Sequence, residues 1–432
     1  MPLTSTAARA VARCGIRPDD VALVLRRMAE ALPHLDLSHW DVAGPDAGFR
    51  AGAIRRGQGP LGLHLPLGEA RLVARATSPL GPVARADRVI LGELTEEARH
   101  LLQTPDRARG AISDFGLATF SRAVARLLAP RLEWEMVLGA LRGLRALASE
   151  TYEGHRISYG LIFTTRPGRG DGPLLSFENK RLKTFTDGFS TALLLDRRGG
   201  LAGIVALVPS PEGVGSSLAR PWWFGSLADT AARVGGVGVA LTRGGDLLVA
   251  HRRQLVVTQR SGLWMLWRHA ELLARIRRSW HTRGRGDQLD RVIVALYRVA
   301  LELALRRSGG LLVVASSREA GRKLVVSRAD LLGSPRRPVE EQRLDASLEG
   351  RLVHHTDRRI VADLASADGA LIVDRTGRLM AYGAMVRSSS SPATQGARSR
   401  AAVAASRLGL AMKVSSDGGI SVYRHGNPVV SL

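Results

Sequence analysis

The chain has 432 residues, which is long enough for two or three domains, each with a buried core of its own. Its 45% hydrophobic content excludes an intrinsically disordered protein, and its longest apolar runs are too short to cross a bilayer, so we expect no membrane partner. A single cysteine, Cys14, excludes an internal disulfide and is typical of a reducing compartment, so we expect a cytoplasmic protein.

The formal net charge of +23 comes mainly from arginine, because only four of the 62 basic residues are lysines. A positive field attracts nucleic acids and nucleotides alike. The arginines are spread along the chain, apart from a local cluster at 275–285, and a compositionally skewed genome produces the same bias. A basic nucleic-acid-associated protein is therefore retained as an alternative that is not favoured.

The first part of the chain, residues 1–110, combines apolar helical stretches with Pro/Gly-rich connections, and its role is unclear from the sequence. Pro18-Asp19-Asp20 precedes an apolar run and predicts a capped helix start. No motif in this region points to a particular chemistry.

The middle of the chain changes from a helical to a strand-like pattern. Between 115 and 149 leucines recur at three- and four-residue steps, which predicts helix. Strand-like runs follow, and hairpins are predicted at 191–207 and 237–250, each around a glycine-containing turn. This order indicates a separate α+β domain over residues 111–265.

A long helical connector is predicted over residues 266–307, with an interruption near 284–286. Short apolar runs at 311–315, 324–326 and 371–373 then predict strands. Their order with the helices implies a compact C-terminal module over residues 285–432. The expected fold class is therefore α/β (α+β), with a mixed sheet in the C-terminal module.

Two short motifs in this module carry the chemistry. Asp368-Gly369-Ala370 opens an apolar strand, and Gly396-Ala397-Arg398-Ser399-Arg400 begins an alanine-rich helical run. Taken separately, the first is an ordinary turn and the second a solvated helix start in an arginine-rich protein. Taken together, an acidic residue that can hold a metal and paired arginines at a helix start suit a triphosphate site.

The stretch 368–386 (DGALIVDRTGRLMAYGAMV) with 396–402 (GARSRAA) resembles the diadenylate cyclase (DAC) domain family. The segments 304–316 and 412–421 are similar to that family's first core strand and last hairpin. Residues 111–265 resemble the sensor domains often placed before DAC modules. The resemblance implies a nucleotide-binding fold and a nucleotidyltransferase that condenses two ATP molecules into cyclic di-AMP under sensor control.

The resemblance also implies a site. Asp368 would be the catalytic residue and the ligand of Mg²⁺ or Mn²⁺, and two subunits would meet as a homo-oligomer through the C-terminal module, each holding one ATP. The remaining implied residues all bind the nucleotide: Gly369, Ala370, Leu371, Gly396, Ala397, Arg398, Ser399 and Arg400.

Four departures from the family pattern bear on catalysis, and the first is that Ser366-Ala367 precede Asp368 where the family has a histidine. Ser399 stands where the family has a metal-binding histidine, and a hydroxyl is a poor substitute for an imidazole at a transition-metal site. Ala397 replaces a threonine, and the acidic pair of the last hairpin is reduced to Asp417. A catalytically degenerate module that binds ATP or a dinucleotide as a sensor or regulator is therefore the alternative.

Overall fold

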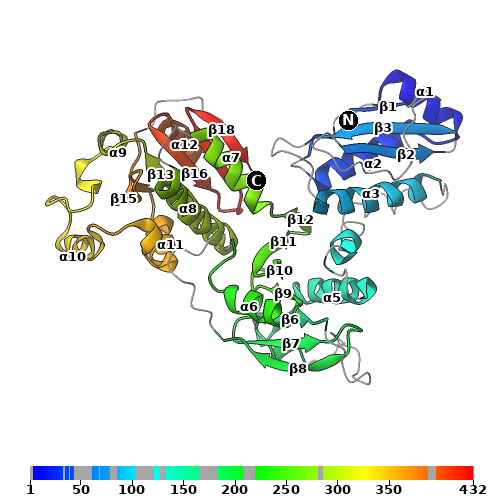
Figure 1. Cartoon of the computed structure of the whole chain (residues 1–432), viewed down its shortest axis with the longest axis horizontal. Coiled ribbons are helices and arrows are strands. Elements are labelled where there is room, and N and C mark those ends of the chain that lie inside the picture. The colour runs from blue at the N-terminus through cyan, green and yellow to red at the C-terminus, as the bar shows by residue number, and fades with distance from the viewer. Residues whose placement is uncertain are drawn as a thin grey trace. The chain divides into compact units, whose positions relative to one another are not determined.

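The computed structural model describes residues 3–32, 35–37, 39–42, 61–67, 69–77, 85–103, 121–126, 128, 133–165, 177, 182–208, 219–280, 286–387 and 396–431 (Figure 1). The chain divides into two compact units. Unit 1 comprises Met1–Val208 and Ser226–Trp267, and unit 2 comprises Pro209–Gly225 and Arg268–Leu432. Both mix helices with parallel and antiparallel strands, which confirms the predicted α/β (α+β) class.

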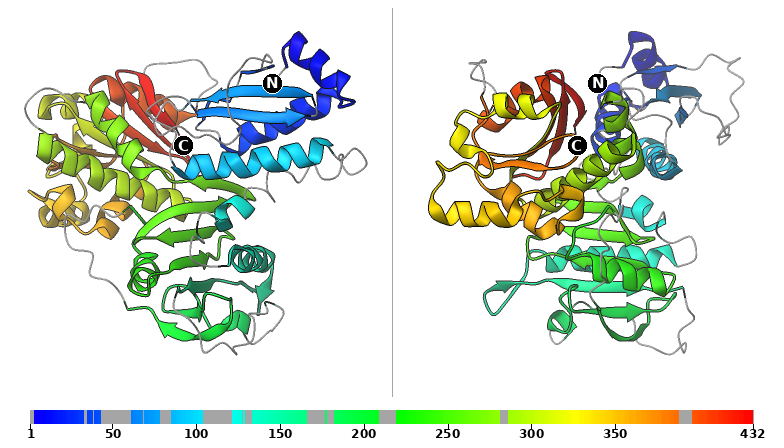
Figure 2. Two further views of the ribbon diagram at one scale, coloured as in Figure 1. Left: turned by 45° about the vertical axis from the view of Figure 1, so that its right-hand side comes forward. Right: turned by 60° about the vertical axis from the view of Figure 1, so that its left-hand side comes forward.

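Unit 1 begins with a small antiparallel sheet and three helices. Its elements are α1 (Ser5–Arg13), α2 (Pro18–Ala31), β1 (Trp40–Val42), β2 (Leu61–Leu67), β3 (Ala70–Ala76) and α3 (Arg85–Gln103), with the strand order β1-β3-β2. The predicted helix start at Pro18 is confirmed, and proline suits the first turn because no amide hydrogen bond is lost there, but the predicted cap is wrong, since no side chain caps this helix. Helix α3 packs against β2 and lies along this small sheet in Figure 1 and in the left view of Figure 2.

The rest of unit 1 is built on a seven-stranded sheet. Its elements are α5 (Trp134–Leu147), β4 (Thr151–Tyr152), β5 (His155–Arg156), β6 (Tyr159–Phe163), η2 (Leu182–Thr184), β7 (Thr191–Leu195), β8 (Leu201–Ala206), α6 (Gly225–Arg233), β9 (Val237–Leu241), β10 (Leu247–His251), β11 (Gln254–Arg260) and β12 (Leu263–Leu266). The strand order is β12-β11-β10-β9-β6-β7-β8.

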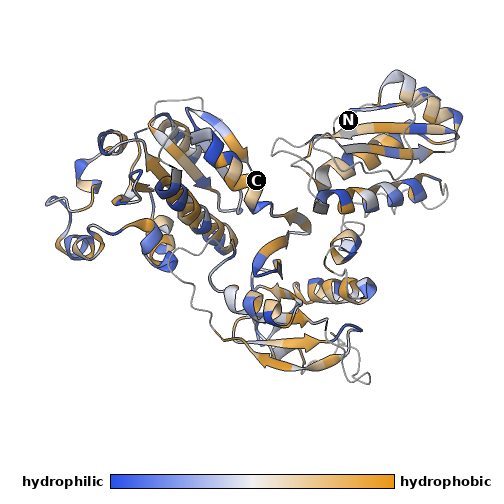
Figure 3. Ribbon diagram, viewed as in Figure 1, coloured by the Kyte–Doolittle hydropathy of each residue, from blue (hydrophilic) through white to orange (hydrophobic). Residues whose placement is uncertain are grey.

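The pairing within this sheet confirms both predicted hairpins, β7 with β8 and β9 with β10. Strands β6 and β7 run parallel, and the other neighbours are antiparallel. The apolar side of α5, including Val137, Leu141 and Leu144, is buried in one continuous core with residues of both sheets. The hydrophobic colouring of β7 and β8 in Figure 3 reflects their apolar sequences.

Unit 2 is a six-stranded mixed sheet with helices. Its elements are α7 (His269–Trp280), α8 (Gly286–Arg306), β13 (Gly310–Ala315), α9 (Arg318–Leu324), η3 (Arg328–Asp330), α10 (Val339–Leu348), η4 (Val353–His355), α11 (Arg358–Ser366), β14 (Ala370–Val373), β15 (Leu379–Ala384), α12 (Ala397–Arg407), β16 (Gly409–Val414), β17 (Ile420–Arg424) and β18 (Asn427–Ser431). The strand order is β15-β14-β13-β16-β17-β18, and only β13 and β14 are parallel.

Helices cover both faces of this sheet. Leu311 and Val313 of β13 are buried in a cluster with Ala402 and Ala405 of α12. Side chains alternate along a strand, so the intervening positions point to the other face. Gly310 confirms this, since a methyl group there would meet Leu303 of α8.

Helices α7 and α8 lie within the helical zone predicted over 266–307, residue 266 belongs to β12, and the predicted interruption lies partly outside the described residues. Both helices pack against the sheet of unit 2. The strand predicted at 324–326 is wrong. Leu324 ends helix α9, whose start is capped by the Ser317 hydroxyl, and only Val325 makes an isolated bridge, with Val386. No described helix combines the length and the hydropathy that a bilayer crossing requires.

Part of the segment 209–225, which lies inside the range predicted for the middle domain, is fastened to unit 2. The Trp222 amide donates to the buried Glu302 carboxylate at 2.6 Å. The Arg358 guanidinium donates to the Arg220 carbonyl at 2.7 Å, and Arg359 lies over the Trp222 ring. These contacts connect the segment to α8 and α11.

Candidate functional site

A pocket of about 480 Å³ lies at one end of the sheet of unit 2. Strands β13 and β14 begin there, β15 and β16 end there, and α12 starts beside them. The volume falls within the range of about 300–1,000 Å³ that is usual for small-molecule sites. Segments distant in the sequence therefore meet here through the pairing of the strands and the position of α12.

Asp368 occupies the connection between α11 and β14, and its side chain is exposed to the pocket. The following residue, Gly369, has a φ of +116°, a conformation that side-chain-bearing residues rarely adopt. A methyl group at Gly369 would overlap the backbone of Gly383, close to the end of β15. The glycine after Asp368 is therefore required by the close approach of two strands, which places the carboxylate at the pocket wall.

The opposite wall is the beginning of α12. Gly396 is the N-cap, and the amides of Ser399 and Arg400 donate to its carbonyl at 2.9 and 3.2 Å. The amides of Ala397 and Arg398 precede these first helical hydrogen bonds. The helix dipole and these amides favour an anion at this end of the helix.

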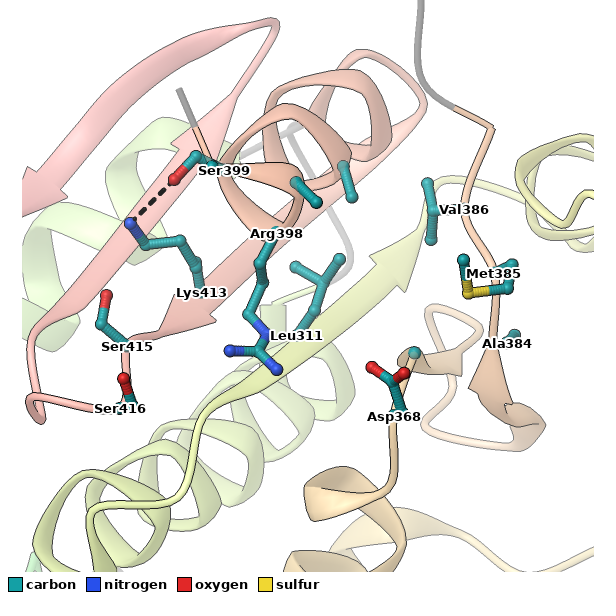
Figure 4. Close-up of a pocket in the computed structure, with 14 residues that line it drawn as sticks. Leu311, Asp368, Ala384, Met385, Val386, Arg398, Ser399, Lys413, Ser415 and Ser416 are labelled. Atoms are coloured by element: carbon teal, nitrogen blue, oxygen red, sulfur yellow. Dashed lines mark hydrogen bonds between the residues drawn. The ribbon is translucent and has the colours of Figure 1, made fainter. Parts of the chain in front are cut away.

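The Arg398 guanidinium lies in front of Gly309, where even a methyl group would overlap it. Figure 4 shows it and the Asp368 carboxylate projecting into the pocket from opposite walls. Within the described part of the chain, neither side chain has a hydrogen-bond or ion-pair partner. Both charges can therefore interact with a ligand.

The third charged group in the pocket is Lys413 on β16, which sequence reasoning missed. Its ammonium group donates to the Ser399 hydroxyl at 3.1 Å (Figure 4). Ser415 and Ser416 continue the same wall. A signal was present in the sequence, because Lys413 is the one charged residue of the otherwise apolar strand β16.

One side of the pocket is apolar. Leu311 of β13 and the chain leaving β15, with Ala384, Met385 and Val386, line it. Met385 is exposed, with 60% of its surface accessible. Apolar walls that meet a few polar groups are typical of sites for organic ligands with a charged end.

The pocket brings together six of the residues predicted from the sequence. They are Asp368, Gly369, Gly396, Ala397, Arg398 and Ser399. Three predicted residues do not line it: Ala370 and Leu371 are buried in β14, and Arg400 points elsewhere because residues two apart on a helix do not face the same way. Asp417 does not line it either, and its carboxylate accepts the Gly419 amide in a turn.

The predicted Mg²⁺ or Mn²⁺ would find one carboxylate here. No group of three His, Cys, Asp or Glu side chains that could hold a metal occurs among the described residues. Asp368 would therefore be joined by phosphate oxygens and water, an arrangement that Mg²⁺ adopts with nucleotides. The residues fit a metal that arrives with a polyphosphate and not a metal site built from protein ligands.

No protein-family model matches the chain, and no curated protein matches its sequence. Solved structures that are similar include a double mutant of DacA from Staphylococcus aureus, at 21% identity and a TM-score of 0.21, which covers 32% of this chain and 85% of that one. Another is a hypothetical membrane spanning protein from Bacillus cereus, at 18% identity and a TM-score of 0.22, covering 32% and 71%. TM-scores at this level bear neither on the fold nor on the chemistry of the site.

Proposed function

We propose that unit 2 binds ATP in this pocket and condenses two ATP molecules into cyclic di-AMP, as a nucleotidyltransferase of the diadenylate cyclase type. One observation carries the proposal: the Asp368 carboxylate and the Arg398 guanidinium face each other across the pocket without partners among the described residues. A carboxylate attracts the cation of a metal-bound polyphosphate, and a guanidinium binds its oxygens. The order of the two motifs in the sequence supports the same reaction.

The remaining walls support a nucleotide over a bare phosphate. Leu311, Met385 and Val386 offer an apolar surface of the kind that accepts a base. Ser415 and Ser416 add hydroxyl donors on the cationic wall. The pocket therefore has one wall for the organic part of the ligand and another for its charged end.

In the proposed reaction, the 3′-hydroxyl oxygen of each ATP attacks the α-phosphorus of the other. The bond between that phosphorus and the bridging oxygen breaks, pyrophosphate leaves, and the hydroxyl proton passes to solvent by way of Asp368. The metal supplies charge neutralisation when it is bound. Two nucleotides must face each other, so the proposal includes a homo-oligomer formed through unit 2, with residues 111–265 as the sensor.

A second candidate function is nucleotide binding without turnover. The observation in its favour is the hydrogen bond between the Lys413 ammonium group and the Ser399 hydroxyl. These two groups stand where the family has its metal-binding histidine. In this case the module would report ATP or a dinucleotide to unit 1 or to a partner.

The test is incubation of the full chain with ATP and Mn²⁺ or Mg²⁺, with chromatography for cyclic di-AMP and pyrophosphate. The proposal expects both products, and it expects Asp368→Asn to abolish them while ATP binding by calorimetry persists. ATP binding without product, together with product formation by Ser399→His, would establish the second function. Absence of ATP binding would overturn the first function, and absence of binding of both ATP and cyclic di-AMP would overturn the second.

A further inference from the structure

Lys413 lies near the end of β16, where the apolar core of unit 2 meets the pocket, and its neighbour across β17 is Ser421. It pairs with Leu311 across β13 and β16, and Ala411, two residues earlier on the same face of β16, is buried in the core with α12. Lysine is among the residues least often buried, so its presence here is unfavourable for packing alone. Its side chain is half-buried and reaches the pocket.

The ammonium group of Lys413 is held by a neutral partner. Its hydrogen bond to the Ser399 hydroxyl uses one of three donors, and the residues that the structure describes give it no carboxylate. Lys323, on α9, provides a contrast, because it is exposed and forms an ion pair with Glu319 at 2.5 Å. The positive charge of Lys413 therefore lies at the pocket wall, and no carboxylate among the described residues neutralises it.

The choice of lysine does not follow from the composition of the chain. Only four of 62 basic residues are lysines, so a random basic substitution in this chain would bring arginine. Lysine differs from arginine in presenting a compact ammonium group with three donors in place of a planar fork. A compact ammonium group can approach a phosphate oxygen as a point charge.

We propose that Lys413 is a phosphate-binding residue of this pocket, positioned by Ser399, and that it selects for ligands with a polyphosphate end. Together with Arg398 and the amides at the start of α12, it forms an anion site on the wall opposite Asp368. This inference rests on the proposed ATP site and identifies the group that distinguishes ATP from adenosine within it.

The test compares the affinity for α,β-methylene ATP, which cannot react at the α-phosphorus, with the affinity for adenosine, by calorimetry in Mg²⁺ at constant salt. Lys413→Met is expected to weaken binding of the ATP analogue about tenfold to hundredfold and to leave adenosine binding unchanged. Lys413→Arg should retain most of the affinity, and Ser399→Ala should lose a few-fold.

Lys323→Met is the matched control, because it removes a lysine of the same unit outside the pocket. Circular dichroism establishes that each variant is folded. If Lys413→Met binds the analogue as tightly as Lys323→Met does, or weakens adenosine equally, Lys413 has only a structural role and the inference is wrong. If the wild-type protein itself fails to bind the analogue, the proposed ATP site fails instead.

Discussion

Arg398 and Arg400 offer a sharp test of the site, because the sequence treats them alike and the structure separates them. Arg398 is half-buried at the pocket and has no partner among the described residues, whereas Arg400 does not line the pocket. A charge-assisted hydrogen bond to phosphate contributes about 1.5–3 kcal/mol. Arg398→Ala should therefore raise the Kd for ATP about 10- to 150-fold.

Arg400→Ala should change the same Kd by less than about fivefold, because a cation outside the pocket contributes less than about 1 kcal/mol through solvent. Calorimetric titration with the ATP analogue measures the Kd of both variants. The salt concentration is about 0.15 M, close to physiological ionic strength. Each substitution removes one positive charge. The effect of the protein's overall positive charge on the Kd is therefore the same for both variants. Equal losses from the two substitutions would refute the geometric argument and favour a diffuse electrostatic attraction.

Three further predictions concern stability. Gly369→Ala should destabilise unit 2 by about 1–3 kcal/mol because of its backbone conformation, and steric overlap should add to this loss. Gly350 has a φ of +75° with open space around it, so Gly350→Ala should show the backbone effect alone. Urea unfolding of both variants measures the difference. Glu302→Ala should cost about 3–5 kcal/mol, because it removes the buried ion-pair partner of Arg358 as well as the acceptor of the Trp222 amide; a loss below 1 kcal/mol would contradict the role of that carboxylate. Burial alone would raise the pKa of Asp374, but hydrogen bonds to its carboxylate lower it overall. Its stabilising effect is therefore present above the unfolded pKa of about 3.9 and is lost as the pH falls through the lower folded value. The difference in unfolding free energy between wild type and Asp374→Asn should shrink over that acidic range, and a constant difference would be inconsistent with this linkage.

Much of the local structure could be predicted from the sequence, because it depends on short-range periodicity. The hairpins at 191–207 and 237–250 follow from apolar runs around glycine turns, and α2 follows from Pro18 and its flanking acidic residues. The wrong strand prediction at 324–326 also arose from a short-range pattern. A short apolar run is compatible with both helix and strand, and the cap at Ser317 decided for the helix.

The motifs Asp368-Gly369-Ala370 and Gly396 to Arg400 were also visible in the sequence, since a motif needs only residue identity and spacing. The sequence did not show which residues of the two motifs line the pocket. The register of β13 against β16 brings Lys413 beside Leu311, and the turn of α12 directs Arg398, but not Arg400, into the pocket.

The sequence by itself therefore determined the fold class, the hairpins and the two chemical motifs, because local spacing and residue type encode them. The tertiary structure alone decided which side chains share the pocket. In it, Lys413 contacts Ser399, and Ala370 and Leu371 are buried in β14. The physical reason is that the direction of a side chain depends on strand pairing and helix position. Residues far apart in the chain set both.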